Sequence, residues 1–545
     1  MNAIKGMMAG SAALMILGAC ANEAEPNDAT NNTSDSEQHN NEENNDPNDA
    51  QADGDHEDIL NLHLQAAPVS LDPHGANDGN SLYVMNPIYD TLVELNTDLE
   101  LQPALAEHYE PLDETTWQFE LREDVTFHDG SPFNADVVKA NLDRVRDPDL
   151  ASPLGFLFDM IDEVEVVDDY TVTITTDFPF SALPSHLAHP GGHMVSLEQI
   201  EADRAHVEDG GEPFVTVSEN PIGTGYMKFD SQTPGESVSL VRHDGYWADP
   251  AGVEAITFSV TPEDLTRVGE LETGSAQIIY PVNANDISRI NSNDGTSVLE
   301  SPSANLTYLG MNTEAEPFDD IRVRQAISMA VNKQDVIEIA TDGVALEANG
   351  PLAPTVIGYS ENVSSIGFDP EEAKALLAEA GYPDGFSTTI TSNDGRAFID
   401  IAETAQSNLR EIGIDAEIET METGTYLDVT GQGDSELFVG SWGTVTLDAD
   451  YGLYAMFHSS NAGAPGNRSF LANDEIDALL EAARQETDEQ ERLALYEEVQ
   501  QLIADEAPMV FLYHSVLLAG LEDRVDGFFQ YPSSFPYLKD VRLTE

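Results

Sequence analysis

Arginine is the residue type whose scarcity makes its positions informative. The chain has 22 Lys and Arg against 101 Asp and Glu. Arg396, in Asn-Asp-Gly-Arg, and Arg468, in Gly-Asn-Arg-Ser-Phe, lie in sequence contexts typical of turns. A guanidinium can bind a carboxylate through two parallel hydrogen bonds. Each arginine is therefore a candidate for holding a carboxylate, and a surface ion pair in an acid-rich protein is the alternative.

Catalytic motifs are missing from the sequence. It contains no nucleophile elbow, no HExxH and no phosphate-binding loop, so we expect no enzyme activity and no catalytic residue. Thirteen histidines are present, and we find none paired at the spacing of a metal motif. We therefore expect no cofactor and no metal site. A chelated metal would need few protein ligands, so the histidine spacing does not exclude one.

The net charge limits the partners and suggests the habitat. A formal charge of −79 argues against nucleic acid and anionic lipid headgroups, because both repel a polyanion. Self-repulsion at this charge destabilises a compact state unless salt screens it, and the Debye length falls to about 3 Å at 1 M salt. We expect a salt-rich environment, and an acidic surface without special meaning is the alternative.

The N-terminus carries a targeting signal. Residues 6–19 are apolar or small and precede Cys20, the only cysteine. Such a stretch is short for a membrane span but suits a signal peptide. Leu17-Gly18-Ala19-Cys20 resembles the bacterial lipobox, whose cysteine is lipidated and becomes the mature N-terminus. We predict a lipoprotein signal peptide over 1–20 and a lipid anchor at Cys20, with a plain secretory signal as the alternative.

An acidic segment follows the signal. Residues 21–58 contain 13 Asp and Glu and neither Lys nor Arg. A segment of this composition cannot bury enough apolar surface to offset its ordering entropy, and its own charge extends it. We predict a disordered tether over 21–58, with the folded part beginning near Ile59. The rest of the sequence contains no apolar run long enough to predict a transmembrane helix.

Local patterns in the second half predict mixed α/β structure. Asp369 and Pro370 start a helix that Gly381 ends. A strand over 386–391, a helix over 399–412 and a strand over 414–419 form a βαβ unit with parallel strands. Further elements are a strand over 436–442, a helix over 488–507 and a strand over 509–514. In the first half, 116–121 and 164–175 read as strands, the latter turning at Asp168, and a helix runs from Asn134 to Arg144.

Several segments together resemble the family 5 extracellular solute-binding proteins, the peptide- and nickel-binding components of ABC importers. They are, in the order and spacing of the family, residues 117–133, 221–226, 245–247, 318–327, 330–333 and 369–377. Within the family, residues 138–144, 187–190 and 381–389, and Asp448-Ala449-Asp450 after Trp442, are most similar to the glutathione-binding branch. The resemblance runs from about Ile59 to the C-terminus.

The resemblance implies a fold and a domain arrangement. The expected fold is the α/β, two-lobed periplasmic-binding-protein-like fold (class II, cluster C), with an extra small domain inserted in the first lobe. We expect the first lobe over 59–305 plus 512–545, with the insertion at about 95–215, and the second lobe over 306–511. The lobes would close on a ligand bound between them, which shifts the population toward the closed state.

The resemblance also implies ligand contacts. In peptide-binding relatives an Asp shortly after a strand-end Trp binds the α-amine. Here Trp442 ends a predicted strand, and Asp448 and Asp450 are the matching acids, although such relatives keep the acid closer to the Trp. Arg396 and Arg468 are the candidates for the ligand carboxylates. Tyr83, Tyr308 and Trp442 are expected in turns, where they can pack on ligand side chains, although for Tyr308 we expect core packing rather than a ligand contact.

We therefore expect a monomeric, lipid-anchored protein that binds a small peptide, with glutathione the first choice, and delivers it to ABC permease and ATPase subunits. It would face the extracellular side of a cell membrane of Gram-positive type. Binding of a nickel chelate, binding or sensing of longer oligopeptides, and a signalling rather than nutritional role remain open alternatives.

Overall fold

The computed structural model describes residues 58–544 of the chain. The predicted signal peptide 1–20 with its lipidation site Cys20, and the predicted tether apart from its last residue, lie outside the described residues. Within the described range, no helix is long and apolar enough to cross a bilayer. The first strand, β1, begins at Ile59.

One large sheet organises the molecule, with strand order β15-β14-β16-β12-β17-β11-β1-β10-β9-β8. The half that belongs to the first lobe is built around β1, whose alternating buried and half-buried residues match the period of two of a strand. Its strands are β8 (Met227–Thr233), β9 (Ser237–Arg242), β10 (Ala255–Val260), β1 (Ile59–Leu64) and β11 (Ile278–Tyr280).

The half in the second lobe contains the predicted βαβ unit. β14 (Ser387–Asn393) and β15 (Asp415–Met421) pair in parallel and are joined by α11 (Arg396–Glu411), which confirms the prediction. β16 (Leu437–Gly443) lies between β14 and β12. Successive residues of β16 point to opposite faces, because Leu437 and Val439 join one buried cluster and Phe438 joins another.

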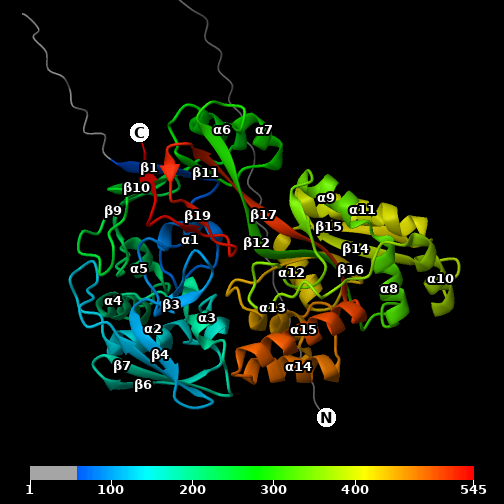
Figure 1. Cartoon of the computed structure of the whole chain (residues 1–545), viewed down its shortest axis with the longest axis horizontal. Coiled ribbons are helices and arrows are strands. Elements are labelled where there is room, and N and C mark those ends of the chain that lie inside the picture. Colours follow the sequence, from blue (N-terminus) through cyan, green and yellow to red (C-terminus); the bar gives the residue numbers. More distant parts are fainter. Residues whose placement is uncertain (1–57, 545) are drawn as a thin grey trace, which may run out of the picture. The chain divides into compact units, whose positions relative to one another are not determined.

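Two long strands join the lobes. β12 (Thr296–Met311) and β17 (Met509–Glu522) run antiparallel, side by side, through both halves of the sheet (Figure 1). Their register shifts between Pro302 and Leu306. Before the shift β17 borders β11, and beyond it β12 borders β16. The irregular stretch therefore lies where the part of the sheet around β11 meets the part around β16. β17 is longer than the predicted strand 509–514 because it crosses both lobes.

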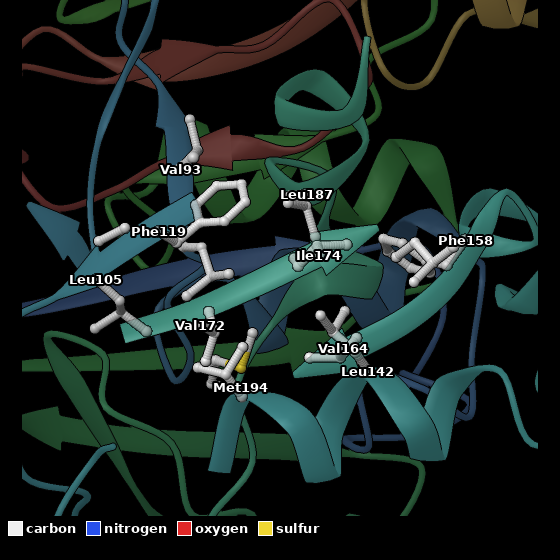
Figure 2. Close-up of a cluster of buried hydrophobic side chains, with 14 of the residues drawn as sticks. Val93, Leu105, Phe119, Leu142, Phe158, Val164, Val172, Ile174, Leu187 and Met194 are labelled. Atoms are coloured by element: carbon white, nitrogen blue, oxygen red, sulfur yellow. The ribbon is translucent and has the colours of Figure 1, made fainter. Parts of the chain in front are cut away.

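A separate antiparallel sheet forms the insertion in the first lobe. Its strand order is β4-β5-β7-β6, and its helix α2 packs on one face. Figure 2 shows Phe119, Val172 and Ile174 of the strands gathered with Leu142 of α2. The elements are β4 (Ala106–Pro111), β5 (Thr116–Leu121), α2 (Ala135–Val145), β6 (Ile161–Asp168), β7 (Thr171–Thr176) and the short helices η1 (Gly155–Phe158) and α3 (Leu183–Leu187). The predicted strand 116–121, helix and hairpin are confirmed.

Helix α10 (Pro370–Ala380) illustrates why local sequence predicts many boundaries. The Asp369 side chain accepts the Glu372 N–H at 3.0 Å, and Pro370 occupies the first helical position. Gly381 ends the helix with a φ of 103°, which a residue with a Cβ rarely adopts. Both ends of α10 and the long helix α15 (Glu489–Glu506) are confirmed.

The remaining elements cover the two lobes. In the first lobe they are α1 (Gly79–Met85), β2 (Val93–Leu95), β3 (Leu101–Pro103), η2 (Pro190–Gly192), α4 (Leu197–Glu208), α5 (Val215–Glu219), α6 (Asp264–Glu272), η3 (Ala284–Asp286), α7 (Ile287–Ile290) and, near the C-terminus, β18 (Val525–Asp526), β19 (Phe529–Gln530), β20 (Pro536–Tyr537) and β21 (Arg542–Leu543). In the second lobe they are α8 (Ile321–Ala330), α9 (Lys333–Thr341), β13 (Ala345–Glu347), α12 (Thr423–Gly431), α13 (Ala449–Phe457), η4 (Ser459–Asn461) and α14 (Asp474–Gln485). The lobe limits of 59–305 with 512–545, and of 306–511, remain a proposal.

Candidate ligand-binding site between the lobes

Trp442 lies where β16 ends, close to the insertion of the first lobe. Its ring stacks on Tyr451 of α13, with centroids 5.4 Å apart. The centre of the Tyr451 ring lies 6.1 Å from that of Phe156 and 6.5 Å from that of His186, and both of these residues belong to the insertion. The indole Nε1 of Trp442 is buried and has no hydrogen-bond partner among residues 58–544. Because an unpaired buried donor costs about 1–3 kcal/mol, this N–H is a group that a ligand acceptor would satisfy.

Asp448 is held by an arginine of the same lobe. It is 2% exposed, and it accepts hydrogen bonds from Arg492 Nη2 at 2.6 Å and Nη1 at 3.1 Å. The same carboxylate caps α13 by accepting the Asp450 N–H at 2.8 Å. Burial lowers the pKa of Arg492, but the charge of Asp448 outweighs it and holds that pKa above its ordinary value. A ligand amine would reach Asp448 only by competing with Arg492.

Asp450 is held in the same way by Arg484. The two oxygens of Asp450, which is 1% exposed, accept from Arg484 Nε at 2.8 Å and Nη2 at 2.9 Å. Burial by itself raises the pKa of Asp450, but the charge of Arg484 and its hydrogen bonds hold that pKa below its ordinary value. His186 Nε2 lies 3.9 Å from the same carboxylate. Asp450 is therefore ionised and already paired.

The two arginines named from the sequence lie in different surroundings. Arg396 is the first residue of α11, not part of a turn, and its exposed side chain pairs with Asp400 at 2.7 Å. Arg468 lies after η4, and its Nη1 donates to Leu427 O at 2.7 Å and Thr430 Oγ1 at 2.6 Å. Within the described range no carboxylate lies within 4.0 Å of the Arg468 guanidinium nitrogens. The charge of Arg468 is therefore available to a ligand carboxylate, whereas that of Arg396 is already paired with Asp400.

The three aromatic residues lie in regular elements, so the prediction that they lie in turns is wrong. Tyr83 is inside α1 and fully buried, donates its OH to Gln530 at 2.8 Å and stacks on Tyr280 at 4.8 Å. Tyr308 is inside β12 and 2% exposed, and burial raises its pKa to about 12 while the charge of Arg468 acts in the opposite direction. Tyr83 and Tyr308 each belong to a cluster of buried hydrophobic side chains, which confirms core packing for Tyr308.

A cavity of about 270 Å³ lies between the insertion and the second lobe. Its walls include Trp117 and Phe180 from the insertion and the Asp448–Arg492 pair from the second lobe. Four carboxylates line it as well: Asp113, Glu114, Glu486 and Glu489. Trp442 is not among its lining residues. Since the acids outnumber the one arginine, which is already paired, this cavity suits the apolar or amino part of a ligand better than a carboxylate.

Sequence reasoning missed Arg484 and Arg492, which decide the state of the predicted acids. Both lie on the helical pair α14–α15 rather than in a turn. The pairing cannot be predicted from a local pattern, because the arginines lie far from the acids along the chain. The scarcity of arginine was the only signal in the sequence that could have identified them. In the described part of the chain, no group of three or more His, Cys, Asp or Glu is arranged to hold a metal ion.

Comparisons with known proteins agree with this architecture. Residues 100–464 match the family model described as bacterial extracellular solute-binding proteins, family 5 middle. The glutathione-binding protein GsiB of Pectobacterium atrosepticum is 35% identical over 485 residues, covering 87% of this chain and 92% of GsiB.

Solved structures give the same result. HbpA2 from Haemophilus parasuis is 30% identical, with a TM-score of 0.80 over 89% of this chain and 100% of HbpA2. The ABC transporter-associated periplasmic binding protein DppA from Helicobacter pylori, in complex with peptide STSA, is 29% identical, with a TM-score of 0.75 over 89% of this chain and 98% of DppA. These neighbours confirm the predicted two-lobed fold, and the chain belongs to the family 5 bacterial extracellular solute-binding proteins.

Proposed function

We propose that this protein is the lipid-anchored, glutathione-binding component of an ABC importer. The coarser statement needs no proposal: it is a substrate-binding protein of an ABC transporter, and its homologues are solute-binding proteins rather than enzymes. The observation that carries the ligand is the 35% identity to a glutathione-binding protein over 92% of that protein's length.

Two residues of the second lobe supply groups that a tripeptide with two carboxylates and one amine needs. Trp442 offers an unpaired buried N–H, and Arg468 offers a guanidinium without a carboxylate partner in the described range. We propose these two as the first ligand contacts. Asp448, Asp450, Arg396, Tyr83 and Tyr308 remain proposed contacts of lower rank, because the two acids and Arg396 are already paired and the two tyrosines are buried.

Charge determines the conditions under which an anionic ligand can bind. Glutathione is a net anion, and the protein carries −79. At about 0.1 M salt the Debye length is about 10 Å, so the acidic surface still repels an approaching anion, whereas at 1 M it is about 3 Å. Capture of glutathione therefore requires salt, local arginines such as Arg468, or both.

The anchor, the location and the partners complete the proposal. Lipidation at Cys20 would hold the protein on the extracellular face of the membrane, with residues 21–58 as a tether. The closed, loaded protein would then dock as a monomer on permease and ATPase subunits. A second acyl chain makes such an anchor stable rather than marginal.

Thermal-shift and calorimetric titration of the full chain in molar NaCl test the ligand. The panel contains glutathione, glutathione disulfide, di- to pentapeptides and nickel–histidine. A ligand that binds only the native state at a hundredfold excess over its Kd stabilises it by about 2.7 kcal/mol. We expect a shift with glutathione. A shift with peptides alone would replace glutathione by the second candidate, a peptide importer, which the 29% identity to DppA bound to STSA favours. A shift with nickel–histidine alone would refute both candidates.

A further inference from the structure

Arg484 lies at the end of α14, and its own lobe fixes its orientation. Asp450 holds the guanidinium through two hydrogen bonds, and the guanidinium carbon lies 3.5 Å from the centre of the Tyr454 ring. Both partners belong to α13. The arginine is therefore positioned whether or not the first lobe is nearby, and its charge is balanced within the second lobe.

The first lobe supplies the other half of the contact. Phe178 and Phe180 lie between β7 and α3, with ring centres 5.2 and 5.3 Å from the Arg484 guanidinium carbon. The backbone carbonyl of Arg484 accepts hydrogen bonds from Ser181 N–H and Ser181 Oγ, each at 3.4 Å. A segment of the insertion thus surrounds a preset arginine of the opposite lobe.

This contact is made by residues of the chain alone. No carboxylate of the first lobe pairs with Arg484 among the described residues, so the attraction between Arg484 and the first lobe comes from the aromatic faces and the Ser181 hydrogen bonds. A cation over an aromatic face favours association by about threefold when exposed to about thirtyfold when desolvated. Arg484 is shielded from water, so we expect a value within this range.

We propose that Arg484 and the segment Phe178–Ser181 form a closure latch, which stabilises the closed arrangement of the lobes before any ligand is bound. If a ligand binds only the closed protein, its apparent Kd is the intrinsic Kd divided by the fraction of protein that is closed. The latch therefore sets a part of the affinity that is the same for every ligand. This inference does not depend on which ligand the protein binds.

Variants of Phe178 test the latch while leaving both residues of the Asp450–Arg484 pair unchanged. Phe178→Ala removes a half-buried ring from the contact, and Phe178→Leu keeps apolar volume but removes the aromatic face. Tyr109→Ala is the matched control, because Tyr109 is a half-buried aromatic of the same insertion whose ring packs on Trp117 and Phe119 of that insertion. Arg484→Lys keeps the charge but loses the planar group that packs between the rings.

The readout is taken in the opposite lobe, using the full chain without ligand. Amide hydrogen exchange of residues 445–454, which contact the insertion through Tyr451, is compared between variants. We expect at least threefold faster exchange there in Phe178→Ala and Arg484→Lys, a smaller increase in Phe178→Leu, and none in Tyr109→Ala. Small-angle scattering should show a radius of gyration that increases over the wild type in the same variants and in the same order.

Two results would overturn the latch. One is exchange in 445–454 that is identical in Phe178→Ala and the wild type, at equal melting temperature. The other is acceleration by Tyr109→Ala equal to that by Phe178→Ala, which would mean that general loosening of the insertion is the cause. If none of the ligands in the panel binds, the proposed function fails, but the exchange experiment still decides on the latch.

Discussion

Arg492 and Asp448 form a bidentate pair, with Nη2 to Oδ1 at 2.6 Å and Nη1 to Oδ2 at 3.1 Å. The pair links two helices of the second lobe, because Asp448 caps α13 and Arg492 lies on α15. Both side chains are buried, so each charge depends on the other for compensation. The acid that the sequence offers to a ligand amine is thus already used in holding two helices together.

Asp448→Asn should therefore act on stability first. Removing one partner of a buried ion pair costs about 3–5 kcal/mol, because the other charge is left uncompensated. Urea denaturation of the full chain measures this, with Asp428→Asn on the exposed face of α12 as the control. Unchanged stability together with lost ligand binding would contradict the structural role and make Asp448 a ligand contact.

Acid should destabilise the protein through two histidines of the first lobe. Burial, helped by a neighbouring histidine in each case, lowers the pKa of His189 and of His193 from 6.5 to about 3. Below pH 6.5 the unfolded chain binds protons that the folded chain does not, so stability falls as the pH drops from 6.5 toward 3. At pH 5 each histidine should cost about 2 kcal/mol.

Melting temperatures from pH 7.5 to 4.5 in molar salt test this. His189→Asn retains an acceptor for the Gly191 N–H, which His189 Nδ1 accepts at 2.9 Å, and should flatten the profile. His108→Asn, at an exposed position, should leave it unchanged. Equal acid sensitivity of wild type and His189→Asn would show that other groups control the transition.

Salt should stabilise the folded state. With 101 acidic against 22 basic residues, raising NaCl from 0.1 to 2 M screens repulsion that acts in the compact state more than in the unfolded chain. Calorimetry should show a rising melting temperature, and sodium sulfate at equal ionic strength separates screening from preferential exclusion. A melting temperature independent of NaCl would refute the halophilic interpretation.

Arg468→Ala should weaken glutathione binding by about tenfold to hundredfold, the value of a hydrogen bond to a charged group. Arg468→Lys should recover part of the affinity, and Arg396→Ala and Arg410→Ala, both at exposed positions, should lose little. Titration calorimetry at constant salt measures all four. Because Arg468 also binds the end of α12, each melting temperature is checked. Equal losses in Arg396→Ala and Arg468→Ala would indicate a general charge effect.

Cys20→Ser should release the protein from the membrane. Without the thiol no acyl chain can be attached, so the protein should move to the soluble fraction and lose labelling by an alkyne fatty acid. Labelled, membrane-bound Cys20→Ser protein would refute the anchor.

The sequence by itself determined what local chemistry controls. The cap at Asp369, the stop at Gly381 and the βαβ unit of β14, α11 and β15 follow from residues a few positions apart, and the structure confirms them. The ordered family segments determined the two-lobed fold. Only the tertiary structure decided the state of the site. Asp448 meets Arg492 across 44 positions and Asp450 meets Arg484 across 34, and any of many acids could have filled those places in so acidic a chain. Pairing, burial and closure depend on how the helices pack, and no short-range pattern records that.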